Sequence, residues 1–158
     1  MNRINKLFNE KKQNILSLYF CAGHPTAGST ADIIRTLAAR GIDMLEIGIP
    51  FSDPMADGPV IQDAATKALR NGMNLHRLFE ELKDIRQDVE IPLILMGYLN
   101  PIFHYGFEAF CQSCADCRID GVIIPDLPFR DYMETFKPIA DRHGLKIIML
   151  ITPETSEE

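Results

Sequence analysis

The sequence predicts an α/β fold in which helices cover a parallel sheet. Short apolar runs rich in β-branched residues alternate along the chain with longer segments whose apolar residues recur at helical spacing. Each predicted strand after the first is preceded by a predicted helix, and a crossover helix of this kind joins parallel strands. With 158 residues, of which 46% are hydrophobic, the chain can bury one core. We therefore expect one domain that spans residues 1–158.

Five segments have the character of strands, because each is a short apolar run next to turn-forming or polar residues. In chain order they are Ile15–Ala22, Asp43–Ile49, Pro92–Met96, Gly121–Ile124 and Lys146–Ile151. Apolar residues three and four positions apart predict helices between them, at Thr30–Arg40, Val60–Arg70 continuing as Leu75–Arg86, Phe107–Cys117 and Arg130–His143. Ser29 or Thr30 can cap the first helix, and Gly41 and Gly72 stand where helices end in the left-handed conformation.

Two architectures fit this alternation. A doubly wound sheet of five strands would be complete at this length, whereas a (β/α)8 barrel needs roughly 250 residues and would here stop after its fifth strand. The turn at residues 21–28 has neither the glycine pattern of a dinucleotide site nor the lysine of a P-loop. Polar or glycine-rich sequence follows each of the first four strands, as expected where active-site loops gather on one face of a barrel. We therefore expect an incomplete (β/α)8 TIM barrel of five parallel strands with covering helices.

Composition excludes several classes of partner. The chain has 16 basic and 22 acidic residues, a formal net charge of −6, and no local cluster of lysine and arginine, so we expect no nucleic-acid partner. No apolar run is long enough to cross a bilayer, and the first twelve residues lack the apolar core of a signal peptide. These observations favour a cytoplasmic protein that does not bind membranes.

The four cysteines do not resemble the disulfide framework of a small secreted domain, so we expect reduced thiols. Cys111, Cys114 and Cys117 have the spacing of iron–sulfur ligands, but the fourth cysteine and its proline are missing. They continue the apolar stripe of Phe107 and Phe110, which favours a buried helix face. The four histidines share no ligand spacing, and we expect no metal site.

Glu46 is the first catalytic candidate, because it interrupts an otherwise apolar strand and a buried carboxylate is costly without a partner or a task. The loop at residues 51–59 follows directly and carries two more carboxylates, Asp53 and Asp57. A structural ion pair is the alternative for Glu46, and simple turn formation is the alternative for the two aspartates.

Residues 45–62, LEIGIPFSDPMADGPVIQ, resemble the signature of the tryptophan synthase alpha chain family. Residues 23–25, 96–101 and 120–128 are similar to the same family in order and spacing, so the resemblance covers the whole chain. It implies a TIM barrel with about three further β/α units after residue 158. A fragment and a natural truncation both fit this expectation.

The resemblance implies retro-aldol cleavage of indole-3-glycerol phosphate to indole and glyceraldehyde 3-phosphate in tryptophan biosynthesis. Such a lyase needs a group that protonates the indole ring carbon, a group that removes the glycerol hydroxyl proton, and a charge that balances the cationic ring. By resemblance, Glu46 is the general acid/base and Asp57 is an ionised acceptor of the indole N–H. Lys146, the only strand lysine, lies at the wrong end of its strand for a Schiff base.

The resemblance also assigns substrate contacts and partners. Tyr19, Tyr98, Ile123 and Leu150 would line an apolar slot for the indole, with Met96 beside them. Independently of the resemblance, we expect Asn100 and Asp126 at strand ends beside this slot, where their polar side chains would orient the loop that carries Asp57 through hydrogen bonds. Asp53 would serve the partner interface. The expected partner is a tryptophan synthase beta chain in an alpha-beta heterotetramer, with pyridoxal phosphate on the beta chain and no cofactor on this chain.

The phosphate site of such barrels is usually formed by loops after the seventh and eighth strands, which these 158 residues do not include. Two alternatives therefore stay open. One is a truncated, non-catalytic half-barrel that binds a beta chain. The other is a different phosphate-sugar barrel enzyme of the same pathway, against which the loop at residues 52–59 argues.

Overall fold

The computed structural model describes residues 2–54 and 57–155 and contains a parallel sheet of five strands. The strands are β1 Ser17–Cys21, β2 Met44–Gly48, β3 Leu93–Met96, β4 Gly121–Ile123 and β5 Lys146–Ile148. They lie side by side in the order β1-β2-β3-β4-β5. A doubly wound sheet reverses its strand order at a switch point, whereas a barrel adds each strand next to the last. The strand order therefore confirms the barrel prediction and excludes the doubly wound alternative.

The helices match the expected alternation with some differences in extent. They are α1 Arg3–Glu10, α2 Thr30–Ala39, α3 Pro59–Arg70, α4 Leu75–Leu82, a 3₁₀ turn Ile85–Gln87, α5 Leu99–Tyr105, α6 Phe107–Asp116, α7 Phe129–Asp131, a π-helical stretch Tyr132–Phe136 and α8 Lys137–Arg142. Gly41 and Gly72 have φ values of +83° and +79°, which confirms them as helix terminators. Ser29 precedes α2, but its hydroxyl donates to the carbonyl of Thr26 (2.6 Å) and makes no side-chain cap of the helix.

Two helices, α1 and α5, were absent from the sequence prediction because contacts distant in the chain stabilise them. Asn2 caps α1 through its side-chain oxygen and also donates from Nδ2 to the carbonyl of Asp120 (2.8 Å). The backbone N–H of Leu99 in the first turn of α5 donates to the carboxylate of Asp126 (2.8 Å). Helices of eight and seven residues are marginal in isolation, so such tertiary partners decide whether they form.

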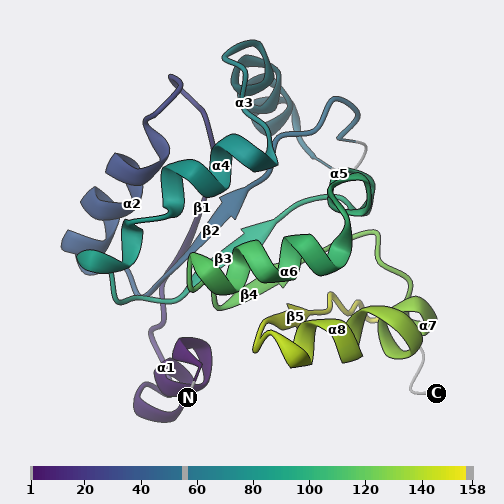
Figure 1. Cartoon of the computed structure of the whole chain (residues 1–158). Helices are drawn as coiled ribbons and strands as arrows, with labels where there is room; N and C mark the ends of the chain where they lie inside the picture. Colours follow the sequence, from purple (N-terminus) through teal and green to yellow (C-terminus); the bar gives the residue numbers. More distant parts are fainter. Residues whose placement is uncertain (1, 55–56, 156–158) are drawn as a thin grey trace.

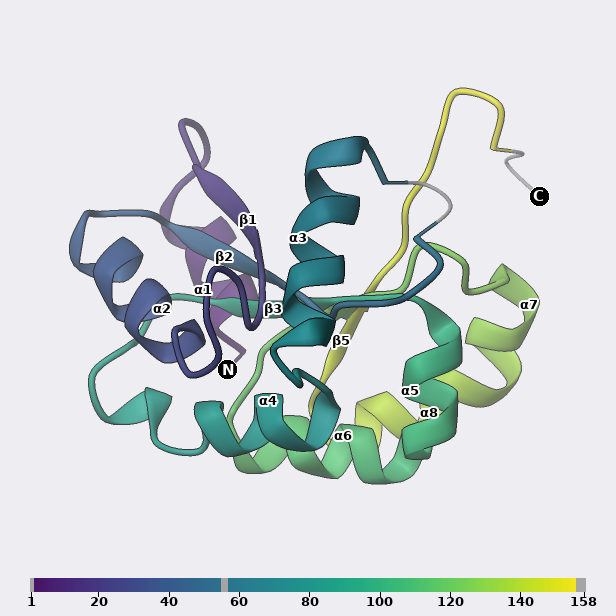
Figure 2. The same cartoon turned by 90° about the horizontal axis from the view of Figure 1, so that it is seen from above.

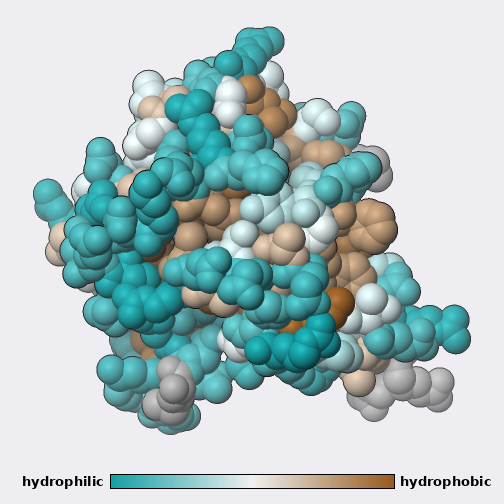
Figure 3. All heavy atoms as spheres, viewed as in Figure 1, coloured by the Kyte–Doolittle hydropathy of each residue, from teal (hydrophilic) through white to brown (hydrophobic). Residues whose placement is uncertain are grey.

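The core lies between the sheet and the layer formed by α2, α4, α6 and α8, which Figures 1 and 2 show on one face of the strands. Leu45 and Ile47 of β2 and Leu93 and Leu95 of β3 point toward this layer and are fully buried. On the outer side of this helix layer, hydrophilic residues cover much of the surface in Figure 3. The sheet face opposite these helices, here called the inner face, carries the alternate residues of each strand.

The expected buried helix face of α6 is confirmed, because Cys111 and Cys114 of the helix and Cys117 directly after it are all buried. Burial raises the pKa of the Cys117 thiol to about 11. Among residues 2–54 and 57–155 no group of three or more His, Cys, Asp or Glu side chains is arranged to hold a metal ion. None of the described helices has the length and apolar character that crossing a membrane requires.

A buried ion pair joins the N-terminal ends of β3 and β4. Arg86 Nη2 lies 2.6 Å from Asp120 Oδ2, and both side chains are almost completely buried. The same carboxylate accepts the backbone N–H of Leu93 at the start of β3 (3.0 Å), and Arg3 of α1 lies 3.4 Å from its other oxygen. Burial lowers the pKa of Arg86 to about 10, which leaves the guanidinium charged at neutral pH.

Candidate active site

Glu46 lies on the inner face of β2, between Tyr19 of β1 and Ile94 of β3 in the sheet register. It is half-buried, and its Oε1 accepts a hydrogen bond from the hydroxyl of Ser17 at 2.7 Å. The alternative of a structural ion pair finds no support, because no salt bridge to Glu46 is found among the described residues. Glu46 therefore faces the inner side of the sheet with one neutral hydrogen-bond donor.

Asp57 lies in the loop that follows β2, two residues before α3 begins at Pro59. Its Oδ2 accepts a hydrogen bond from the hydroxyl of Tyr98 at 3.2 Å. Gln62, in the second turn of α3, donates to the backbone carbonyl of Asp57 (2.8 Å). The Tyr98 ring also packs against Phe51, with 5.4 Å between the ring centroids. The Asp57 loop is thus connected both to its own helix and to the turn after β3.

Tyr19 pairs with Glu46 in the sheet register and lies on the same inner face. A Cβ built on Gly48 would lie 2.1 Å from the Tyr19 hydroxyl, so the ring crosses directly over this glycine and requires it. Burial raises the pKa of Tyr19, and the negative charges of Asp57 and Glu46 act in the same direction. The Tyr19 hydroxyl therefore stays protonated at neutral pH and can donate a hydrogen bond beside both acids.

Ile123 and Leu150, which were also predicted to line the indole slot, differ in their position on the sheet and in their exposure to solvent. Met96 of β3 and Ile123 of β4 are register partners on the inner face, and Ile123 is only 7% exposed. Leu150 lies beyond the end of β5 and is 57% exposed. The predicted extension of this strand to Ile151 was wrong, because β5 ends at Ile148.

The three polar residues expected near the slot differ in their contacts. Asn100 was expected at a strand end, but it is exposed in the first turn of α5. The Asp126 carboxylate accepts the backbone N–H of Leu99 at the start of α5. The neighbouring Tyr98 donates to Asp57, so Asp126 influences the Asp57 loop indirectly, through the turn that contains Tyr98 and Leu99. Asp53 accepts a hydrogen bond from the hydroxyl of Ser52 (2.6 Å) at an exposed position in the loop.

Ser17 is a residue of this site that sequence reasoning missed. A serine near the start of a strand is unremarkable by itself. Its position becomes informative only with the register, which pairs Ser17 with Met44 and thereby brings its side chain within reach of Glu46.

Cys21 lies at the C-terminal end of β1, and burial together with the charge of Asp57 raises its pKa to about 11. Because the thiolate is the reactive form, a raised pKa leaves less of it at pH 8. We expect iodoacetamide to modify Cys21 more than about tenfold more slowly in the native chain than in urea at pH 8. Mass spectrometry of the peptide that carries Cys21 measures the rate, which should rise as the pH approaches 11. Equal rates in the native and unfolded chains would contradict the described surroundings of this thiol.

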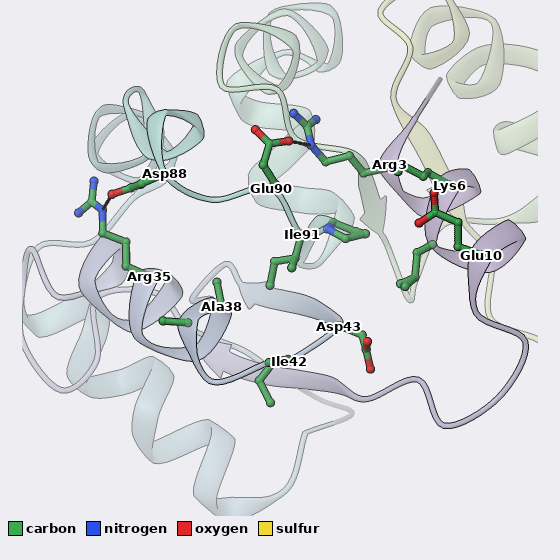
Figure 4. Close-up of a pocket in the computed structure, with 14 residues that line it drawn as sticks. Arg3, Lys6, Glu10, Arg35, Ala38, Ile42, Asp43, Asp88, Glu90 and Ile91 are labelled. Carbon is green, nitrogen blue, oxygen red and sulfur yellow. Dashed lines mark hydrogen bonds and ion pairs between the residues drawn. The ribbon is translucent and has the colours of Figure 1, made fainter.

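Two of the cavities found among the described residues lie away from these side chains. One of about 1020 Å³ lies between α1 and α2, where Arg3 meets Glu90 and Arg35 meets Asp88 (Figure 4). It opens at the N-terminal ends of the strands, the end of a barrel that serves stability rather than catalysis. The other, about 400 Å³, lies between the Asp57 loop, α4 and α5. Neither cavity is lined by a predicted site residue. The candidate active site is the inner face at the C-terminal end of β2, where Glu46, Tyr19 and the Asp57 loop lie.

A family model described as "Tryptophan synthase alpha chain" matches residues 5–158. The chain belongs to the tryptophan synthase alpha chain family. The tryptophan synthase alpha chain of Bacteroides fragilis (strain ATCC 25285) is 68% identical over 158 residues, which are 100% of this chain and 60% of that protein. The crystal structure of tryptophan synthase subunit alpha from Legionella pneumophila str. Paris superposes with a TM-score of 0.93 at 40% identity, covering 99% of this chain and 61% of that one.

A tryptophan synthase complex from Pyrococcus furiosus is similar with a TM-score of 0.81 and 35% identity, covering 89% of this chain and 57% of the matched chain. These tryptophan synthase neighbours are TIM barrels, and the fold prediction from the sequence is confirmed. The chain spans about 60% of the length of the curated tryptophan synthase alpha chains that it matches.

Proposed function

We propose that this chain carries the catalytic carboxylates of a tryptophan synthase alpha chain, a lyase that cleaves indole-3-glycerol phosphate into indole and glyceraldehyde 3-phosphate. The observation that carries the proposal is the pair of acids that bracket Tyr19, with Glu46 on the inner face of β2 and Asp57 in the loop directly after it. Glu46 pairs with Tyr19 in the sheet register, and burial together with the negative charges of Asp57 and Glu46 raises the pKa of Tyr19. Membership of the tryptophan synthase alpha chain family is the reason for proposing a lyase reaction at these acids.

In this proposal Glu46 is the general acid and base that transfers protons to and from the substrate. It protonates the indole ring carbon and accepts the proton of the glycerol hydroxyl as the carbon–carbon bond breaks. Asp57 accepts the indole N–H and balances the positive charge that develops on the ring. The hydroxyl of Tyr98 keeps the Asp57 carboxylate in place before substrate arrives. Tyr19, Tyr98, Ile123 and Leu150 line the indole slot.

The proposal extends to partners. A tryptophan synthase beta chain is the proposed macromolecular partner, in keeping with the similarity to a chain of the Pyrococcus furiosus tryptophan synthase complex. Exposed Asp53 and Asn100 lie on the same loop end of the sheet and are proposed interface residues. We propose no cofactor on this chain, pyridoxal phosphate on the beta chain, an alpha-beta heterotetramer and a cytoplasmic location.

The test uses residues 1–158 followed by the remaining part of the Bacteroides fragilis relative, here called the extended chain. We expect this chain to release indole from indole-3-glycerol phosphate. Asp57→Asn should lower the rate at least about tenfold, because the neutral amide cannot balance the cationic ring. Asp53→Asn is the matched control, since it removes a carboxylate from the same loop, and its rate without a beta chain should stay within about twofold of the unsubstituted protein.

Equal rates for the Asp57→Asn and unsubstituted chains would remove Asp57 from the catalytic role. An extended chain that co-sediments with a beta chain but releases no indole would instead support the non-catalytic alternative. Residues 1–158 without the extension, assayed in parallel, measure how much activity these units have by themselves.

A further inference from the structure

Ser17 is the only donor to the Glu46 carboxylate among the residues that the structure describes. Its hydroxyl oxygen lies 2.7 Å from Oε1, and no hydrogen bond to Oε2 is found among the described residues. The two carboxylate oxygens of Glu46 are therefore not equivalent. A group that transfers a proton benefits from such asymmetry, because the proton must be on the oxygen that meets the substrate.

The hydroxyl approaches Glu46 from the end of the sheet opposite the Asp57 loop. Ser17 pairs with Met44 in the register, and Tyr19, one inner-face position further along β1, pairs with Glu46. Asp57 and Tyr98 lie at the C-terminal ends of β2 and β3. The contact with Ser17 therefore occupies the side of the carboxylate that faces away from the Asp57 loop.

The main chain beside Ser17 is itself fixed. The backbone N–H of Leu16 donates to Asp43 Oδ2 at 2.8 Å, and Lys11 Nζ lies 2.7 Å from Oδ1 of the same carboxylate. The Lys11 hydrogen bond and the Leu16 N–H lower the pKa of Asp43, so this anchor stays charged at neutral pH. A serine has one rotatable bond between such a backbone and its hydroxyl, which limits where Oγ can lie.

We propose that Ser17 is a positioning residue that holds Oε1 of Glu46 and thereby assigns the transferred proton to Oε2. A hydroxyl can donate to Oε1 in both states of the cycle, because a protonated carboxyl keeps one acceptor oxygen. The bond to Ser17 therefore survives when Glu46 gains or gives up its proton. The inference rests on the proposed acid/base role of Glu46.

Ser17→Thr and Ser17→Val form a matched pair for the test, because they have nearly the same shape and only threonine keeps the hydroxyl. In the extended chain we expect Ser17→Val to lower kcat for indole release about threefold to tenfold, with KM changed less than about twofold. Ser17→Thr should keep at least about half of the kcat. Ser17→Ala repeats the loss without added bulk, in case valine disturbs the strand.

The decisive comparison repeats the Ser17→Val change in a Glu46→Gln background. If Ser17 acts through Glu46, the second change should lower the residual rate no further. An equal fall in both backgrounds, a change in KM alone, or full activity of both Ser17→Val and Ser17→Ala would overturn the inference. Full activity of Glu46→Gln by itself would instead overturn the proposed function, so the two failures are distinguishable.

Discussion

Replacing Glu46 by glutamine should lower indole release by the extended chain by about 10²-fold to 10⁴-fold. Glutamine has the shape of the glutamate side chain, and its amide oxygen can still accept the hydroxyl of Ser17. The fold should therefore survive, whereas the amide cannot carry the proton that the ring carbon needs. Steady-state assays of indole release measure kcat and KM, and thermal unfolding followed by circular dichroism checks the fold.

Glu90→Gln is the control for the loss of a carboxylate. Glu90 precedes β3 at the opposite end of the sheet, and its side chain is 79% exposed and 3.4 Å from Arg3. We expect its turnover to match the unsubstituted chain within about twofold. A Glu46→Gln rate within about threefold of the unsubstituted chain would exclude Glu46 as the acid/base.

The candidate position of Glu46 was predictable because it depends on a local pattern. Alternation along a strand places Leu45 and Ile47 on the helix side and Glu46 on the other, and no distant contact is needed to establish this. The same reasoning located all five strands and the order of the crossover helices, since an apolar run in a covered parallel sheet is marked strongly in the sequence. The placement of Asp57 directly after β2 followed in the same way.

Features that depend on pairing between distant segments were not predictable. The Ser17 contact needs the register between β1 and β2, and a shift by one residue would turn Ser17 to the other face. Helix α5 depends on the carboxylate of Asp126, 27 residues away from Leu99. Asn100 was therefore predicted at a strand end, because no residue near it in the sequence indicates that α5 begins there.

Asp120→Asn should lower the free energy of unfolding by about 3–5 kcal/mol, the largest stability effect that we expect. The side chains of Asp120 and Arg86 are 3% and 4% exposed, so the substitution leaves a buried guanidinium without its counter-charge. Both carboxylate oxygens accept hydrogen bonds, Oδ2 from Arg86 and Leu93 and Oδ1 from Arg3, so in either orientation an amide turns its N–H₂ group toward donors. Urea denaturation of the extended chain, followed by circular dichroism, measures the change.

Asp63→Asn is the control, because Asp63 pairs with Lys67 on the exposed surface of α3 and should change stability by less than about 0.5 kcal/mol. A similarly small effect of Asp120→Asn would mean that the carbonyl oxygens of Val89 and Ile91, which accept from Arg86, satisfy the guanidinium by themselves.

The same substitution should affect the free energy of unfolding but not the turnover rate. The buried pair lies at the N-terminal ends of the strands, so Asp120→Asn protein that is still folded should keep the kcat of the unsubstituted chain at low temperature. A fall in kcat without a loss of stability would show instead that the two ends of the sheet are coupled through β4.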